Sequence, residues 1–457
     1  MGQIVRIFSI LSGCFASAAS YALVEGTVSY QASQWLASPA LLSGASHLST
    51  LQGELQGSWS RNWFQSGVDA GGIWTINSPE LYLFYVRELY VGSTPKRLPY
   101  ARFQFGRVHR IWNFADEEWK LGLWEPRVRW NPLHPQSQGL VGAFAEWKRG
   151  PFELRSAVLL ANIPTQSAPT SLKDGKISSN HPFGQSAPES LDLEGASIPI
   201  EYKQNIPSIA SLLFRPGVAL YAGLGQERGF WMNAAYAFKP MSTYALSSVH
   251  SLTADPQVAH VTLTPRVLYH HLTSASVGYR NPQVETQLGI EGEWPIDLSP
   301  VHGTNTTTQN FLPLGVLGWS LDFQLPELPH LKPRVGLGYV RVFGEGSEEV
   351  GALAREGTRL FGTRIDHREA GRVRFNFDFP IRPRWGISTS ITWIQDFAFG
   401  ATFLNPEIRA RLADRWHVII GADLLGSGSD RLDQDEGQLL TRSRLQDHVY
   451  GGLTYAF

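Results

Sequence analysis

The sequence predicts an all-β fold, a transmembrane antiparallel β-barrel of about 18 strands, within a range of about 16 to 20. Two observations predict it. Many segments alternate apolar and polar side chains with a period of two, as a strand between lipid and a polar interior must. Beyond residue 22, no run of about 18 apolar residues occurs, so no membrane-spanning helix is expected.

Gly371–Phe379 shows the alternation most clearly, because its valine and phenylalanines share one face and Arg372 and Arg374 lie on the other. The same pattern is found in Phe230–Lys239, Val284–Trp294, Leu317–Gln324 and Trp416–Leu424. A soluble β-sandwich would alternate as well. Here, however, the apolar faces carry aromatic residues near strand ends, where the interfacial girdles of a membrane barrel lie: Trp294, Trp393, Trp416 and Tyr455.

The connections between strands can be assigned to sides by working back from the C-terminus, which we place at the periplasmic edge. Outer loops are then expected at Asp423–Gln446, Phe397–Gly400, Gly344–Ala370 and Pro295–Pro313. Periplasmic turns are expected at Leu412–Arg415, Pro380–Pro383, Leu325–Pro333 and Asn281–Pro282. Between Ala161 and Pro256 short and long connections do not alternate, and Ser197–Gln204 and Thr243–Leu252 are only candidate strands.

The N-terminus predicts an export signal over residues 1–22, with Arg6 as its positive region and small residues at Ser20 and Ala22 before the cleavage point. The remainder, 23–457, is expected to form a single barrel domain. The only cysteine, Cys14, follows Leu11-Ser12-Gly13 in the manner of a lipoprotein signal, so lipidation is the alternative to ordinary cleavage. A single cysteine permits no intrachain disulfide.

The last strand alternates to the final residue, with Tyr450, Gly452, Tyr455 and Phe457 at characteristic positions. This spacing resembles the signal that the barrel-assembly machinery of Gram-negative bacteria reads on its substrates. The resemblance implies a bacterial outer-membrane location. The expected partners are the assembly machinery, outer-membrane lipid and lipopolysaccharide.

Composition argues against other classes of protein. The formal net charge is -1 and only 17% of residues are charged, which does not suit a nucleic-acid binder. No metal-ligand spacing or cofactor motif occurs, so no cofactor is expected. The acidic run Asp430, Asp433, Asp435 and Glu436 lacks the full pattern of a Ca²⁺ loop and is expected to be a solvated outer loop.

The most unusual stretch is Gly106–Leu140, which is long for a simple connection and rich in tryptophan and arginine. We expect residues 107–138 either to fold into the lumen, as a constriction or plug, or to pack as an outer loop on the rim. The candidate constriction residues are Arg107, His109, Arg110, Trp112, Asp116, Trp119, Trp124, Arg127, Arg129 and Trp130.

This stretch also carries a loose family resemblance. Gly106-Arg107, followed by Trp112 and Asp116, resembles the Gly-Arg-x-x-x-x-Trp stretches of alginate-export-type barrels. The residues from Leu121 to Arg127 and from Gln138 to Leu140 resemble uncharacterised barrels of predatory bacteria. The resemblance covers about a tenth of the chain, and it implies a porin-like, solute-conducting barrel without specifying the solute.

Charges of both signs are expected on the lumen wall, at Arg266, Glu285, Glu291, Glu293, Asp322, Arg372, Arg374 and Asp378. A ring of one sign would predict ion selectivity, whereas this mixed set predicts side chains that pair with one another.

Three functions remain open. The first is a channel for passive or substrate-preferring diffusion of small polar solutes, and the second is a barrel plugged by its own loops. The third, a hydrolase at the rim, is the least favoured, because His270, His271, Ser274 and His417 form no recognisable catalytic motif. We therefore do not expect an enzyme.

Overall fold

The structure is a computed structural model, and it describes most of the chain beyond the predicted signal segment. The described residues are 22–36, 46–61, 63–94, 98–184, 187–193, 196–225, 228–252, 258–298, 303, 305–326, 331–344, 346–351, 364–382, 385–426, 439–443 and 446–457. Residues 1–21, with Cys14, and the acidic run at 430–436 lie outside this set, so the expectations about them stay predictions.

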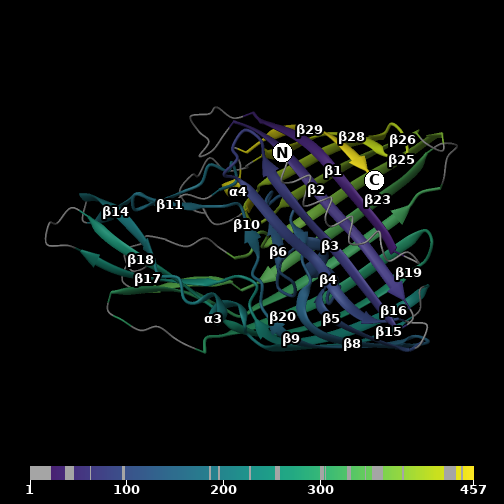
Figure 1. The fold of residues 1–457 in the computed structure, drawn as a ribbon, viewed down its shortest axis with the longest axis horizontal. Helices are drawn as coiled ribbons and strands as arrows, with labels where there is room; N and C mark the ends of the chain where they lie inside the picture. The colour runs from purple at the N-terminus through teal and green to yellow at the C-terminus, as the bar shows by residue number, and fades with distance from the viewer. Residues whose placement is uncertain are drawn as a thin grey trace.

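The chain forms one closed antiparallel barrel of 18 strands, which confirms the predicted fold class and strand number (Figure 1). Around the wall the strands are β1 (Ala22–Trp35), β2 (His47–Arg61), β3 (Phe64–Thr75), β4 (Tyr82–Ser93), β5 (Ala101–Val108), β8 (Leu140–Arg149), β9 (Phe152–Ala161), β15 (Gly217–Gly225), β16 (Gly229–Pro240), β19 (Tyr269–Arg280), β20 (Val284–Ile296), β22 (Leu314–Gln324), β23 (Lys332–Phe343), β25 (Glu369–Arg382), β26 (Trp385–Asp396), β27 (Thr402–Arg411), β28 (Trp416–Gly426) and β29 (His448–Ala456).

The barrel closes where β29 pairs with β1. The Phe457 amide donates to the Gly26 carbonyl at 2.9 Å, and the Gly26 amide donates back to the Phe457 carbonyl at 3.1 Å. The Phe457 ring occupies the space that a side chain at Gly26 would need. The last residue therefore completes the hydrogen-bonded ring of strands, which leaves no free edge in the wall.

The two faces of the wall differ as the alternation predicted. Outward side chains such as Phe230, 82% exposed, and Ile420, 61% exposed, form an apolar outer surface, whereas Arg372 and Arg374 point inward. Exposing so large an apolar surface to water would be highly unfavourable in free energy, whereas in a bilayer this surface contacts the lipid chains. The protein is thus located in the outer membrane. Among the described residues, no helix is long and apolar enough to span a bilayer.

The connections differ in length at the two edges of the barrel. Short turns, such as those at 281–283 and 412–415, lie at the edge that holds the C-terminus, and longer loops lie at the other. We take these edges as periplasmic and extracellular, in line with the usual arrangement in outer-membrane barrels.

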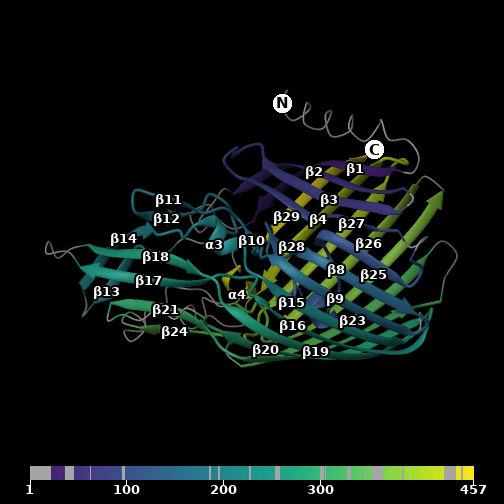
Figure 2. The same cartoon turned by 60° about the horizontal axis from the view of Figure 1, so that its bottom comes forward.

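Four of the long loops add a second sheet of six strands, which extends from the extracellular edge (Figure 2). Its order is β13 (Ser190–Leu193), β14 (Ala196–Gln204), β18 (Ala259–Arg266), β17 (Ala245–Leu252), β21 (Thr306–Phe311) and β24 (Ser347–Gly351). Ser197–Gln204 and most of Thr243–Leu252 are therefore strands, but not barrel strands. This explains why short and long connections could not be alternated upstream of residue 256.

Smaller elements lie between barrel strands. Two short strand groups are β6 (Arg127–Arg129) with β7 (Gln136–Ser137) and β10 (Gln166–Ser167), and the hairpin of β11 (Ser171–Lys173) and β12 (Lys176–Ser178). The helices of the described residues are α2 (Phe114–Trp119), α3 (Ile209–Leu213) and α4 (Leu439–Arg442).

Candidate functional site: the segment that crosses the lumen

The loop between β5 and β8 crosses the inside of the barrel. We call residues 107–138 the lumen segment. It leaves the wall at β5 and re-enters it at the adjacent strand β8. Its helix α2, however, contacts β20 and β22. Around the wall, four strands separate β8 from β20: β9, β15, β16 and β19. A loop can reach inward-facing residues of those distant strands only through the lumen.

The wall receives α2 on a patch of inward-facing glycines. A side-chain carbon at Gly289 would lie 2.5 Å from the Phe114 ring, and one at Gly318 would lie 2.6 Å from the Ala115 methyl group. A side-chain carbon at Gly338 would similarly lie 3.4 Å from the Trp119 ring. Gly289 and Gly318 are direct partners on β20 and β22, so together they leave room for the helix. Glycines within alternating strands were the sequence signal for this close approach.

Local hydrogen bonds shape the lumen segment. Asn113 caps the start of α2, because its side-chain oxygen accepts from the Ala115 amide at 2.6 Å. The Asp116 carboxylate accepts from the amides of Leu123, at 2.8 Å, and Trp124, at 3.3 Å. Arg127 donates to the Asp116 carbonyl at 2.7 Å. The chain after α2 is therefore folded back onto the helix by one aspartate.

The tryptophans of the lumen segment are buried. Trp112 stacks on Trp124 with ring centroids 6.0 Å apart, and the Trp124 indole donates to Glu291 of β20 at 2.9 Å. Trp119 lies beneath the Arg372 guanidinium, 5.2 Å from the ring centroid. Trp130 is also buried. These rings pack the segment against the wall and do not offer open faces to a solute.

The basic candidates of the lumen segment are each held by a partner. Arg129 makes a two-pronged contact with Asp366, at 2.7 and 2.8 Å, and Arg127 lies 3.4 Å from the Asp116 carboxylate. The other pairs are His109 with Glu125, Arg110 with Gln104 and Glu146, and Arg107 with Gln138 and the Gly139 carbonyl. This half of the lumen is a packed and charge-paired interior.

The predicted wall residues divide into three groups. Glu291 and Glu293 are inward and buried; Glu293 pairs with Arg364 at 2.6 Å and contacts His270. The inward pairs are Arg372 with Glu118, Arg374 with Asp322, and Arg280 with Glu285, while Asp378 lies inward near the periplasmic edge. Arg266 is the exception, because it ends β18 of the outer sheet and pairs with Asp297. Its placement on the lumen wall was wrong, since β18 is not a barrel strand.

The opposite part of the wall, β26 to β3, has a different character. Many of its inward side chains are small or polar and half-buried: Ser388, Ser390, Thr392, Thr27, Ser29, Gln31, Gln52 and Glu54. Glu407 and Arg409 of β27 also face inward and pair with one another. Glu54 accepts hydrogen bonds from Tyr85, at 2.8 Å, and Gln52, at 2.9 Å. We call this surface the polar wall. The sequence reasoning missed these residues, although the alternation of β1 and β2 could have identified them.

The extracellular end of the polar wall is covered by aromatic rings. Trp130 of the lumen segment lies 4.5 Å from His181, which belongs to the loop between β9 and β15. Phe183 of that loop packs 6.1 Å from Trp35, and Trp35 stacks on His448 at 4.9 Å. We call these five side chains the outer cover. Burial lowers the pKa of His181 to about 4, because the buried ring loses the hydration that stabilises its charged form.

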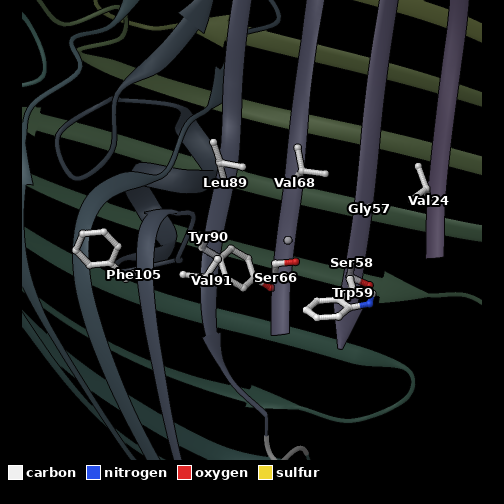
Figure 3. A pocket seen from close by; sticks show the side chains of 11 residues that line it. Val24, Gly57, Ser58, Trp59, Ser66, Val68, Leu89, Tyr90, Val91 and Phe105 are labelled. Atoms are coloured by element: carbon white, nitrogen blue, oxygen red, sulfur yellow. The ribbon is translucent and has the colours of Figure 1, made fainter. Parts of the chain in front are cut away.

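A separate hollow of about 290 Å³ lies outside the lumen, over β1 to β5 (Figure 3). Val68 and Leu89 are cross-strand partners on its surface, and Leu89, Val91 and Phe105 are exposed on the outer face of the barrel. The exposed part of its lining therefore faces lipid. Among the described residues, no group of three or more potential ligands could hold a metal ion.

The closed wall, the apolar outer surface and the polar lumen define a porin-like outer-membrane β-barrel. No protein-family model matches the sequence, and no curated protein matches it.

The chain is similar to solved outer-membrane proteins at low sequence identity. OccAB2 of Acinetobacter baumannii is 9% identical, with 95% of this chain and 98% of that chain covered and a TM-score of 0.46. OccK11 (OpdR) of Pseudomonas aeruginosa is 10% identical, with 95% and 96% covered and a TM-score of 0.45. OmpT of Vibrio cholerae, in its trimer form, is 9% identical, with 96% and 99% covered and a TM-score of 0.42. These likenesses say nothing about a solute.

Proposed function

We propose that the protein is an outer-membrane channel for small polar solutes, which pass between the lumen segment and the polar wall. The observation that carries this proposal is the asymmetry of the lumen. The lumen segment packs buried apolar residues such as Leu123 and Trp124 against β20 to β23, while many inward side chains of β26 to β3 are polar and half-exposed. A plug without a transport role would have no need for a hydrated wall on one side.

The outer cover would then set how the path opens to the exterior. Among the described residues, Trp130, His181 and Phe183 meet through ring contacts, while the start of the same loop is joined to the lumen segment by the pairing of β10 with β6. Ring contacts are individually weak, so the cover residues can separate while β10 stays paired and the charge-paired interior stays intact.

Single-channel recording in a planar bilayer tests the proposal. The wild-type protein should give discrete conductance steps, and a variant that lacks residues 109–138 should give larger ones, because the lumen segment no longer fills half of the lumen. The deletion is feasible since Gly139 lies directly against Val108, so a short glycine–serine linker can join them. Absence of steps in both proteins, each shown to be folded by its heat-modifiable mobility, would exclude a channel.

The alternative is a barrel closed by its own loops, and the outer cover favours it. In that case only the deletion variant would conduct. For a rim hydrolase, the described residues offer little support. His270 is inward, buried and bound to Glu293, whereas its neighbour His271 lies on the outer face and contacts Tyr236.

A further inference from the structure

Three large apolar side chains around α3 are exposed at the extracellular edge of the barrel. Ile206 is 62% exposed, Ile209 72% and Phe214 70%, whereas Leu212 on the other side of the helix is buried. Ile209 begins α3 and Phe214 is its C-cap, whereas Ile206 lies in the chain just before the helix. We call these three exposed side chains the apolar stripe. In water this stripe would have no partner among the described residues.

The stripe continues the lipid-facing surface of the barrel. The Asn162 amide, just after β9, donates to the Leu213 carbonyl at 2.7 Å, and β15 begins at Gly217. The outward side chains nearest this edge are Leu160 of β9 and Val218 of β15, both exposed. Figure 1 shows α3 beside the outer end of β9. The apolar stripe therefore lies directly beyond two strands that already face lipid.

The barrel wall is short at this place. β15 has 9 residues and β9 has 10, compared with 12 in the neighbouring β16 and β19. At about 3.3 Å per residue and a tilt of about 45°, nine residues cover about 21 Å along the membrane normal, less than the roughly 25 Å of an apolar band. Twelve residues cover about 28 Å by the same measure. About nine to eleven residues suffice for a membrane-spanning strand, so β15 can cross the bilayer. Its apolar surface is nevertheless shorter than that of β16 and β19, and an adjoining apolar segment would extend it.

We propose that Ile206, Ile209 and Phe214 insert into the acyl chains of the outer leaflet and extend the apolar band above β9 and β15. The partner is the hydrocarbon of the membrane lipid, because the stripe is apolar and continuous with the lipid-facing wall. The same loop, 162–216, carries His181 of the outer cover and strands β13 and β14 of the outer sheet. Insertion of α3 would hold the end of this loop against the membrane surface, just before the chain enters the barrel wall at β15.

Single-cysteine labelling tests this placement, because the only native cysteine is Cys14. In a background with Cys14→Ser, we would label Ile209→Cys and Phe214→Cys with an environment-sensitive fluorophore in vesicles that contain phospholipids brominated on the acyl chain. Val218→Cys, on the lipid-facing side of β15, is the control for lipid contact. Lys203→Cys, on exposed β14, is the control for water. Heat-modifiable mobility confirms that each labelled variant is folded.

The expected result is blue-shifted emission and loss of intensity at 209 and 214, matching position 218, together with protection from iodide in water. Emission and quenching that match position 203 would overturn the proposal. The test does not depend on conductance, so its failure would leave the proposed channel untouched. Conversely, a barrel without channel activity could still show α3 in the leaflet.

Discussion

At the scale of single residues, His181 shows how burial makes one contact sensitive to pH. Its ring packs against Trp130, and its Nδ1 accepts a hydrogen bond from the Phe183 amide at 3.2 Å. Acceptance by Nδ1 requires the neutral ring, and burial lowers the pKa to about 4. Protonation would both charge a buried ring and remove this acceptor.

We expect the outer cover to loosen as the pH falls. With a pKa of about 4 in the folded state and about 6.5 when the loop is released, the released form binds more protons between these values. The stabilisation by neutral His181 is therefore complete above about pH 6.5 and decreases toward pH 4, with a loss of about 2 kcal/mol at pH 5.

Hydrogen exchange of residues 176–184, corrected for the intrinsic effect of pH, measures this loss as faster exchange at pH 5 than at pH 7. His181→Phe keeps a ring but cannot titrate, so its exchange should depend less on pH. An equal pH dependence in both proteins would contradict the assignment to His181.

At the scale of elements, the inner wall and α2 fit one another through the glycines of β20 and β22. We predict that Gly318→Val displaces α2, because a side chain there must occupy the space of the Ala115 methyl group. The strain is expected to cost about 1–3 kcal/mol. Trypsin should then cleave the lumen segment after Lys120, whereas in the wild-type protein we expect the folded lumen segment inside the barrel to resist cleavage there.

Gly315→Val is the matched control, since Gly315 lies on the same strand and its nearest neighbouring atoms are 3.8 Å away. Both variants should still form the barrel, as judged by heat-modifiable mobility. Equal protease resistance in the two variants would show that α2 does not depend on the glycine surface.

At the scale of the whole molecule, charge is divided between the two halves of the lumen. Arginines of the packed half are paired, as in Arg127 with Asp116 and Arg372 with Glu118. On the polar wall, Arg409 is paired with Glu407, whereas Glu54 accepts only from neutral groups. Neither Glu54 nor Glu25 has a basic partner among the described residues. A conducting path along this wall should therefore favour cations.

Reversal potentials in a KCl gradient test this preference. Glu54→Gln should reduce the permeability ratio of K⁺ to Cl⁻ roughly two- to threefold, the effect of one charge a few ångströms from a hydrated path. Glu189→Gln removes a carboxylate from the exposed outer region and should leave the ratio unchanged. A wild-type channel that prefers anions would refute the role of the polar wall.

Much of the barrel could be predicted because its signals are local. Alternation assigns each residue of Gly371–Phe379 to lipid or lumen, and the turn at Asn281–Pro282 needs only short-range chemistry. The same reasoning failed for Arg266, because β17 and β18 alternate like barrel strands but pair in another sheet. Local patterns identify strands, and they do not identify the sheet to which a strand belongs.

By itself, the sequence determined the membrane barrel, its approximate strand number and the unusual nature of residues 107–138. Only the tertiary structure decided where the lumen segment packs, since Trp124 and Glu291 are 167 residues apart and meet only when the barrel closes. It also decided that the tryptophans are buried and that the polar wall is the half-exposed surface. The physical reason is that periodicity reports which face a residue occupies, whereas a contact across the lumen depends on the closure of the whole ring of strands.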